Sequence, residues 1–124
     1  MTRRMRVSLI ALKEMDELVF LYTTLPKRRK ARQIGKMLVK ERLVACAHIF
    51  KIDSIFNWRG ETEEVGEYAL LMKTRAELYS QAEKRIKELH PYELPAIVCF
   101  SVAGGSEEYL EWIRYETRPS NEEG

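Results

Sequence analysis

The chain has 124 residues, of which 45% are hydrophobic, and this length supports one hydrophobic core but not two separate domains. Its 21 Lys and Arg residues against 19 Asp and Glu residues leave a net charge of +2, which weakly disfavours a DNA- or RNA-binding role. Cys46 and Cys99 lie in apolar segments without a nearby cysteine partner, so we expect free thiols and a cytoplasmic location.

We interpret residues 1–15 as an appended N-terminal arm. Arginines precede a short apolar run at residues 7–12, as they do in a signal peptide, but charged residues interrupt this run too early for secretion or for a membrane span. The sequence leaves open a second translation start at Met15, directly before the first predicted strand.

Residues 17–24 are rich in leucine, valine, aromatic residues and threonine, which predicts a strand that ends before Pro26. Residues 27–42 are predicted to form an amphipathic helix, because Ala31, Ile34 and the apolar residues after them recur at helical spacing. Basic residues crowd the first turn of this helix and oppose its dipole. Either solvent screens these charges, which we favour, or an anion lies near that end.

Residues 43–58 alternate at a period of two and predict one long strand, with Cys46 and His48 on the same face. This length exceeds the usual range, so we expect the strand to project beyond a small sheet. Gly60 makes the turn, and residues 67–73 return as the second strand of a long hairpin.

A second helix is predicted from Thr74, because Thr74 and Glu77 have the spacing of a capping box. Apolar residues at helical spacing follow, and the helix ends at His90. Pro91 causes this end, since proline disfavours helical geometry in the residue before it.

Residues 96–102 form a nearly continuous apolar run, which predicts a central strand with Cys99 buried as an inert packing residue. Ser106 is predicted to cap a short final helix that has two glutamates in its first turn. We therefore expect one folded domain at residues 16–117 and a flexible tail at residues 118–124.

The predicted order is strand, helix, strand, strand, helix and strand, followed by the short helix. This order is typical of the α+β ferredoxin-like fold, in which two helices cover one face of an antiparallel sheet. The other face and the overlong hairpin leave apolar surface that one chain cannot bury. We therefore expect the protein to assemble with copies of itself.

Several ordered motifs resemble those of the CutA divalent-cation-tolerance family. They are TTLP at 23–26, ERLVAC at 41–46, WRG at 58–60, LLMKT at 70–74, HPYELP at 90–95 and YLEWI at 109–113. The resemblance covers about residues 18–117 and implies a ferredoxin-like homotrimer whose sheets pack around a threefold axis. It also implies a connection to tolerance of copper and other divalent metal ions, and an architecture similar to that of trimeric nitrogen-regulatory signal proteins.

Two positions depart from the family pattern. His48 stands where the family usually has asparagine, and Asn57 stands where an aromatic residue commonly precedes Trp58. The first change adds a metal donor near Cys46, and the second is expected to loosen an aromatic cluster.

Three residues are candidate metal ligands. Cys46 and His48 supply a thiolate and an imidazole, a soft pair suited to copper or zinc. A structural role is favoured over ligation, because two ligands fall short of the usual four and a buried cysteine often serves only as a small apolar side chain. His90 is the third candidate, and its position at a helix end equally suits capping.

The turn at residues 90–95 concentrates titratable and hydrogen-bonding side chains, and such loops often form binding clefts. The resemblance implies an inter-subunit pocket formed by this turn and the hairpin. Its candidate residues are Trp58, Glu67, Lys73, Tyr92 and Glu93.

The sequence contains no nucleophile elbow and no phosphate-binding glycine loop, so we do not expect an enzyme. Two functions stay open. The first is a homotrimeric protein that binds copper or another divalent metal ion in the response to metal ions. The second is a trimeric signalling or scaffold protein that binds a small molecule or a protein in clefts between subunits. Neither nucleic acid nor a membrane is an expected partner.

Overall fold

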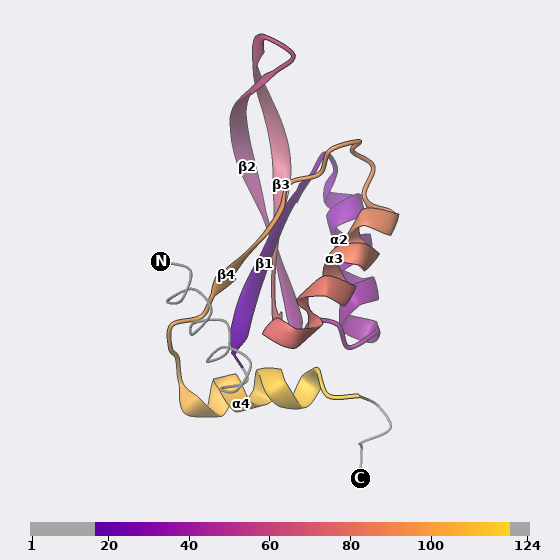
Figure 1. Ribbon diagram of the computed structural model, residues 1–124. Coiled ribbons are helices and arrows are strands. Elements are labelled where there is room, and N and C mark those ends of the chain that lie inside the picture. The colour runs from indigo at the N-terminus through magenta and orange to yellow at the C-terminus, as the bar shows by residue number, and fades with distance from the viewer. Residues whose placement is uncertain (1–16, 120–124) are drawn as a thin grey trace, which may run out of the picture.

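A computed structural model of the chain describes residues 17–119, and its four strands form one antiparallel sheet (Figure 1). In chain order the strands are β1 at Leu18–Leu25, β2 at Cys46–Trp58, β3 at Glu61–Arg75 and β4 at Ile97–Ser101. Their order across the sheet is β2-β3-β1-β4, and every pairing is antiparallel. This arrangement confirms the predicted α+β ferredoxin-like fold. The predicted arm at 1–15 lies outside the described residues, as does most of the predicted tail.

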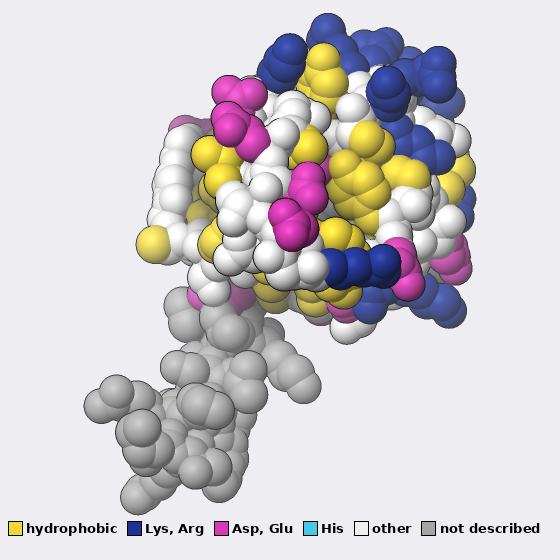
Figure 2. All heavy atoms as spheres, turned by 90° about the horizontal axis from the view of Figure 1, so that it is seen from above, with side chains coloured by type: hydrophobic (Ala, Val, Ile, Leu, Met, Phe, Trp, Pro, Cys, Tyr) yellow, Lys and Arg dark blue, Asp and Glu magenta, His cyan; other side chains and the backbone are white. Residues whose placement is uncertain are grey.

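Helices α2 at Arg28–Lys40 and α3 at Tyr79–Leu89 cover one face of the sheet, and α4 at Glu107–Glu116 crosses the end of the sheet that is lowest in Figure 1. Lys and Arg side chains gather on the side that carries α2 and α3 (Figure 2). None of the helices described between residues 17 and 119 is long and apolar enough to cross a lipid bilayer.

The main core lies between the sheet and helices α2 and α3. Its fully buried side chains include Leu21, Leu25, Ile34, Leu38, Leu70, Met72 and Ile86. Burying an aliphatic side chain of this size contributes about 1.5–3 kcal/mol, so these residues fix both helices on the sheet. A smaller cluster of Leu18, Ala45 and Ile113 attaches α4 to the lower end of the sheet.

The long hairpin is confirmed. Strands β2 and β3 pair without interruption from Cys46 opposite Lys73 to Trp58 opposite Glu61. Arg59 and Gly60 form the turn with φ angles of 53° and 84°, as expected for a two-residue type I′ turn. The hairpin projects well beyond the helices (Figure 1). Strand β3 is longer than the predicted segment 67–73, because its polar first half pairs with β2 without showing an apolar pattern.

The predicted capping box at Thr74 is wrong. Thr74 is the penultimate residue of β3, and its hydroxyl donates to the backbone carbonyl of Leu43 at 2.7 Å. A short 3-10 helix at Ala76–Leu78 precedes α3 and has no side-chain cap. The buried hydroxyl of Thr74 therefore joins β3 to the loop after α2 and is not available to begin a helix. By contrast, Ser106 does cap α4, because its hydroxyl accepts a hydrogen bond from the Tyr109 amide at 3.4 Å.

The prediction that the apolar segment 96–102 forms a central strand is wrong. Strand β4 pairs only with β1 and lies at the edge of the sheet. Val98 and Phe100 are 45% and 52% exposed. The prediction that Cys99 is buried is also wrong, since this residue is exposed. Partial burial of its thiol, with the nearby Glu83 carboxylate, raises the pKa of Cys99. The apolar character of this strand therefore serves a face that one chain leaves uncovered.

We call the side of the sheet opposite α2 and α3 the open face. Cross-strand pairing gives it the side chains of Phe20, Tyr22, Cys46, His48, Phe50, Leu71, Lys73, Val98 and Phe100. Phe50 is 47% exposed, and with Val98 and Phe100 it confirms the predicted apolar surface. Contiguous exposed apolar residues of this kind mark a surface for association.

Candidate functional site

Cys46 and His48 lie together on the open face, close to α4. Pairing of β2 with β3 puts Cys46 opposite Lys73, and His48 follows two residues later on the same face. The Lys73 ammonium lies 3.3 Å from His48 Nε2 and donates to the Tyr109 hydroxyl at 3.0 Å. The Cys46 thiol lies 3.7 Å from the same hydroxyl. The four side chains form a small polar group, which we call the Cys46 cluster.

The Cys46 cluster combines soft donor atoms with a fixed positive charge. Lys73 also lies over the rings of Tyr109 and Phe20, at 5.0 Å and 5.7 Å from their centroids, so aromatic faces hold its ammonium in place. A metal ion would have to displace this ammonium from the imidazole of His48. Within residues 17–119 no three His, Cys, Asp or Glu residues are grouped so as to hold a metal ion. Thiolate and imidazole fit a soft ion in kind, but one chain supplies too few of them.

His90 belongs to a different part of the molecule. It follows α3. The sequence suggested that its imidazole caps that helix, but the ring has other partners. Instead, Nε2 lies 2.8 Å from the Thr24 carbonyl oxygen at the end of β1, and Nδ1 accepts a hydrogen bond from the Tyr92 amide at 3.1 Å. Both ring nitrogens are therefore occupied, and the acceptor role of Nδ1 places the proton on Nε2. His90 anchors the turn at 90–95 to the sheet.

Burial lowers the pKa of His90, and the positive charge of Lys30 lowers it slightly further. The hydrogen bond to Thr24 and the negative charge of Glu67 raise it, but these effects do not offset the burial. A lowered pKa favours the neutral ring in the folded state, so this stabilisation is present above about pH 6.5 and is lost as the pH falls below it. We expect urea midpoints measured from pH 7.5 to pH 5.0 to fall more steeply for the unaltered protein than for His90→Gln.

His48→Gln is the matched control for this experiment, because it removes the other histidine of the chain. It should keep the steep fall below pH 6.5. Equal slopes for the unaltered protein and for His90→Gln would show that His90 does not couple folding to pH.

Glu67 is a carboxylate almost removed from solvent, with 5% of its surface exposed. It lies midway along β3, and the Tyr92 hydroxyl donates to it at 2.7 Å. Burial raises the pKa of Tyr92, and the bond to Glu67 and the negative charge of that carboxylate raise it further. Tyr92 thus joins the turn at 90–95 to the hairpin by a short hydrogen bond to a charged group.

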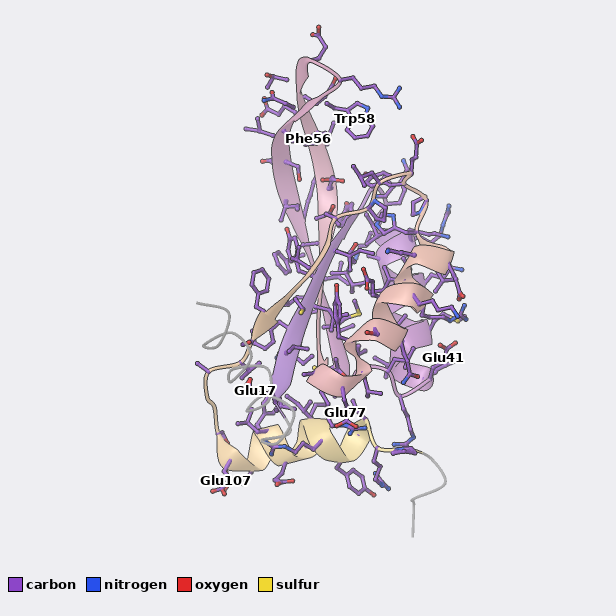
Figure 3. All side chains as sticks on the ribbon, viewed as in Figure 1. Glu17, Glu41, Phe56, Trp58, Glu77 and Glu107 are labelled. Atoms are coloured by element: carbon purple, nitrogen blue, oxygen red, sulfur yellow. The ribbon has the colours of Figure 1, made fainter. Side chains whose placement is uncertain are left out.

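Two adjacent hollows lie beside this hydrogen bond, where the hairpin leaves the sheet. The first is about 370 Å³, and its lining includes Ser54, Glu67 and Tyr92. The second is about 450 Å³, and its lining includes Trp58, Tyr92 and Glu93. Figure 3 shows Trp58 near the tip of the hairpin, above the body of the domain.

The structure thus brings together four of the five residues expected to form a pocket, namely Trp58, Glu67, Tyr92 and Glu93. Lys73 does not join them, because it lies six residues beyond Glu67 on β3, or about 20 Å at the rise of a strand. It belongs instead to the Cys46 cluster. Phe56 and Leu94 also line both hollows, although neither was expected in the pocket from the sequence. The period-two pattern that includes Phe56 and Trp58 was the available signal for the first of them.

Comparison with known proteins gives one consistent result. A model of the CutA1 divalent ion tolerance protein family matches residues 19–116. A divalent-cation tolerance protein CutA from Pyrococcus horikoshii is 41% identical over 101 residues, which are 82% of this chain and 99% of the relative. A protein of the same description from Thermus thermophilus is 43% identical over 104 residues, with coverage of 83% and 99%. The solved structure of a Thermus thermophilus divalent cation tolerance protein matches with a TM-score of 0.79 at 41% identity, over 82% of this chain and 99% of that chain.

Proposed function

Because the chain belongs to the CutA1 family of divalent ion tolerance proteins, we propose that it acts in the response to metal ions as a homotrimer that binds copper or another divalent metal ion. It works by binding and not by catalysis. The observation that carries the proposal is that the side chains of Cys46 and His48, two residues apart on β2, lie on the same uncovered face of the sheet.

Assembly supplies what a single chain lacks. Cys46 and His48 provide two donors, and a soft metal site usually has four. When open faces pack around a threefold axis, residues near that axis come together in equivalent sets. His90 is the weaker candidate ligand of the three, because both of its ring nitrogens already have backbone partners.

Titration calorimetry with copper(I), copper(II) and zinc tests direct ligation. We expect Cys46→Ala/His48→Ala to lose metal binding, because thiolate and imidazole are the soft donors of the cluster. Cys99→Ala/His90→Gln removes the other cysteine and the other histidine, and it should bind metal as the unaltered protein does. Equal heats for all three proteins would exclude Cys46 and His48 as ligands.

The two hollows beside Tyr92 favour a second function, that of a trimeric signalling or scaffold protein. Their volumes of about 370 and 450 Å³ lie in the range of small-molecule sites, and a neighbouring subunit would enclose them further. A thermal-shift screen against metabolites tests this function. A true ligand of the hollows should lose its effect in Tyr92→Ala and keep it in Lys73→Met, because Lys73 lies in the separate Cys46 cluster.

A further inference from the structure

The outer side of α2 carries positive charge that neither proposed site uses. Residues 27–40 contain seven Lys and Arg residues and no acidic residue, although the whole chain has a net charge of only +2. The first turn of α2 contains no acidic side chain to balance them. Figure 2 shows Lys and Arg side chains gathered on the side that carries α2 and α3.

A groove of about 400 Å³ runs between α2 and the edge strand β2. Three cations of α2, Arg32, Lys36 and Lys40, line it, and none of them forms an ion pair with another residue of the range 17–119. The rest of its lining comes from four residues that carry no polar side-chain atoms, Gly35, Val39, Ala47 and Ile49. We call this the α2 groove.

Gly35 sets the depth of the α2 groove. A Cβ atom at this position would lie 3.1 Å from the Cβ of Ala47, which is closer than such atoms normally approach. Without a side chain there, α2 lies close against β2, and the apolar floor is continuous from helix to strand. Val39, which is 38% exposed, stands at the edge of this floor.

The spacing of the three cations matches that of an extended peptide. Arg32, Lys36 and Lys40 are four residues apart, which is about 6 Å per step along a helix axis. Alternate residues of an extended strand are about 6.8 Å apart and point to the same side, while the residues between them point to the other side. A strand along the groove would therefore place every second side chain near a cation and the intervening ones on the apolar floor.

We propose that the α2 groove binds an extended segment of a partner protein in which acidic and apolar residues alternate. Carboxylates pair with the three cations, and the apolar side chains bury Val39 and Ile49. A phosphate polymer or an anionic lipid surface would satisfy the charges but would leave the apolar floor unused. The groove is distinct from the Cys46 cluster, which lies on the opposite face of the sheet.

Fluorescence anisotropy with a labelled peptide of four Glu-Val repeats tests the proposal on the full chain at physiological salt. We expect saturable binding that weakens roughly tenfold or more in Arg32→Glu/Lys36→Glu/Lys40→Glu, because three exposed ion pairs are lost and become repulsive. Val39→Ser should also weaken binding, although it changes no charge. Lys36→Glu alone should weaken it by about threefold or more, whereas Lys84→Glu, the same reversal on α3, should not.

Two comparison probes separate the proposed partner from general attraction to negative charge. A peptide with four Glu followed by four Val has the same composition but not the alternation, and inorganic polyphosphate has charge without apolar groups. Equal binding of either probe, or binding indifferent to Val39→Ser, would overturn the proposal, as would the absence of saturable binding. Cys46→Ala should bind the alternating peptide normally, so this result does not depend on whether the protein binds metal.

Discussion

Replacing Phe50 and Phe100 together by glutamate is expected to convert the proposed trimer into monomers. Both side chains are about half exposed on the open face, on β2 and β4. In the proposed trimer, neighbouring subunits cover this face, and burying two phenylalanines contributes about 1.5–3 kcal/mol each. Glutamate removes that contribution and adds charges that are costly to bury. Sedimentation velocity at a fixed protein concentration measures the change in mass.

The matched control is Val39→Glu/Tyr115→Glu. It introduces the same two charges at exposed apolar positions outside the open face, on α2 and α4. This control should keep the mass of the unaltered protein. An unchanged mass for Phe50→Glu/Phe100→Glu would refute the proposal that the open face is the assembly surface.

Tyr92→Phe is expected to lower the free energy of unfolding by about 1.5–3 kcal/mol, the range for a hydrogen bond to a charged group. The substitution removes one oxygen atom and leaves the Glu67 carboxylate, with 5% of its surface exposed, without its donor at 2.7 Å. Urea denaturation at pH 7.5 and a fixed protein concentration measures the loss.

Tyr68→Phe is the control, since Tyr68 lies one residue after Glu67 on the same strand and its hydroxyl makes no hydrogen bond within residues 17–119. We expect it to change stability by less than about 0.5 kcal/mol. The raised pKa of Tyr92 adds a second readout. Its stabilisation is present below about pH 10 and is lost at higher pH, so Tyr92→Phe should flatten the fall in stability there. Equal losses for the two variants would mean that the bond to Glu67 is not important.

The sequence was sufficient to predict the order of the elements and the long hairpin, because both follow from local periodicity. The alternation from Cys46 to Trp58 and the turn at Gly60 are visible in the residues themselves. The position of Cys46 and His48 on the same face of β2 follows from the same alternation. The polar first half of β3, which lacks an apolar pattern, was missed for the same reason.

The errors arose where tertiary contacts decide the outcome. Thr74 has the spacing of a helix cap, but its hydroxyl bonds to Leu43, which is far away in the sequence. An apolar strand was assigned to the centre of the sheet, although β4 lies at an edge with Val98 and Phe100 exposed. Lys73 was grouped with Tyr92, and only the register of β3 shows that it belongs beside Cys46. Neither spacing nor composition contains this information.

The exposed strand β4 also presents a hazard. Its sequence, from Ile97 to Ser101, contains no lysine, glutamate or proline, the residues with which proteins commonly protect such edges. The unpaired backbone groups along the outer edge of β4 can therefore bind a misfolded chain as well as a correctly folded one. In the assembly that we propose, the time that a newly synthesised subunit spends alone then decides between ordered complexes and fibrous aggregates, so the yield on refolding should depend strongly on the rate at which subunits meet.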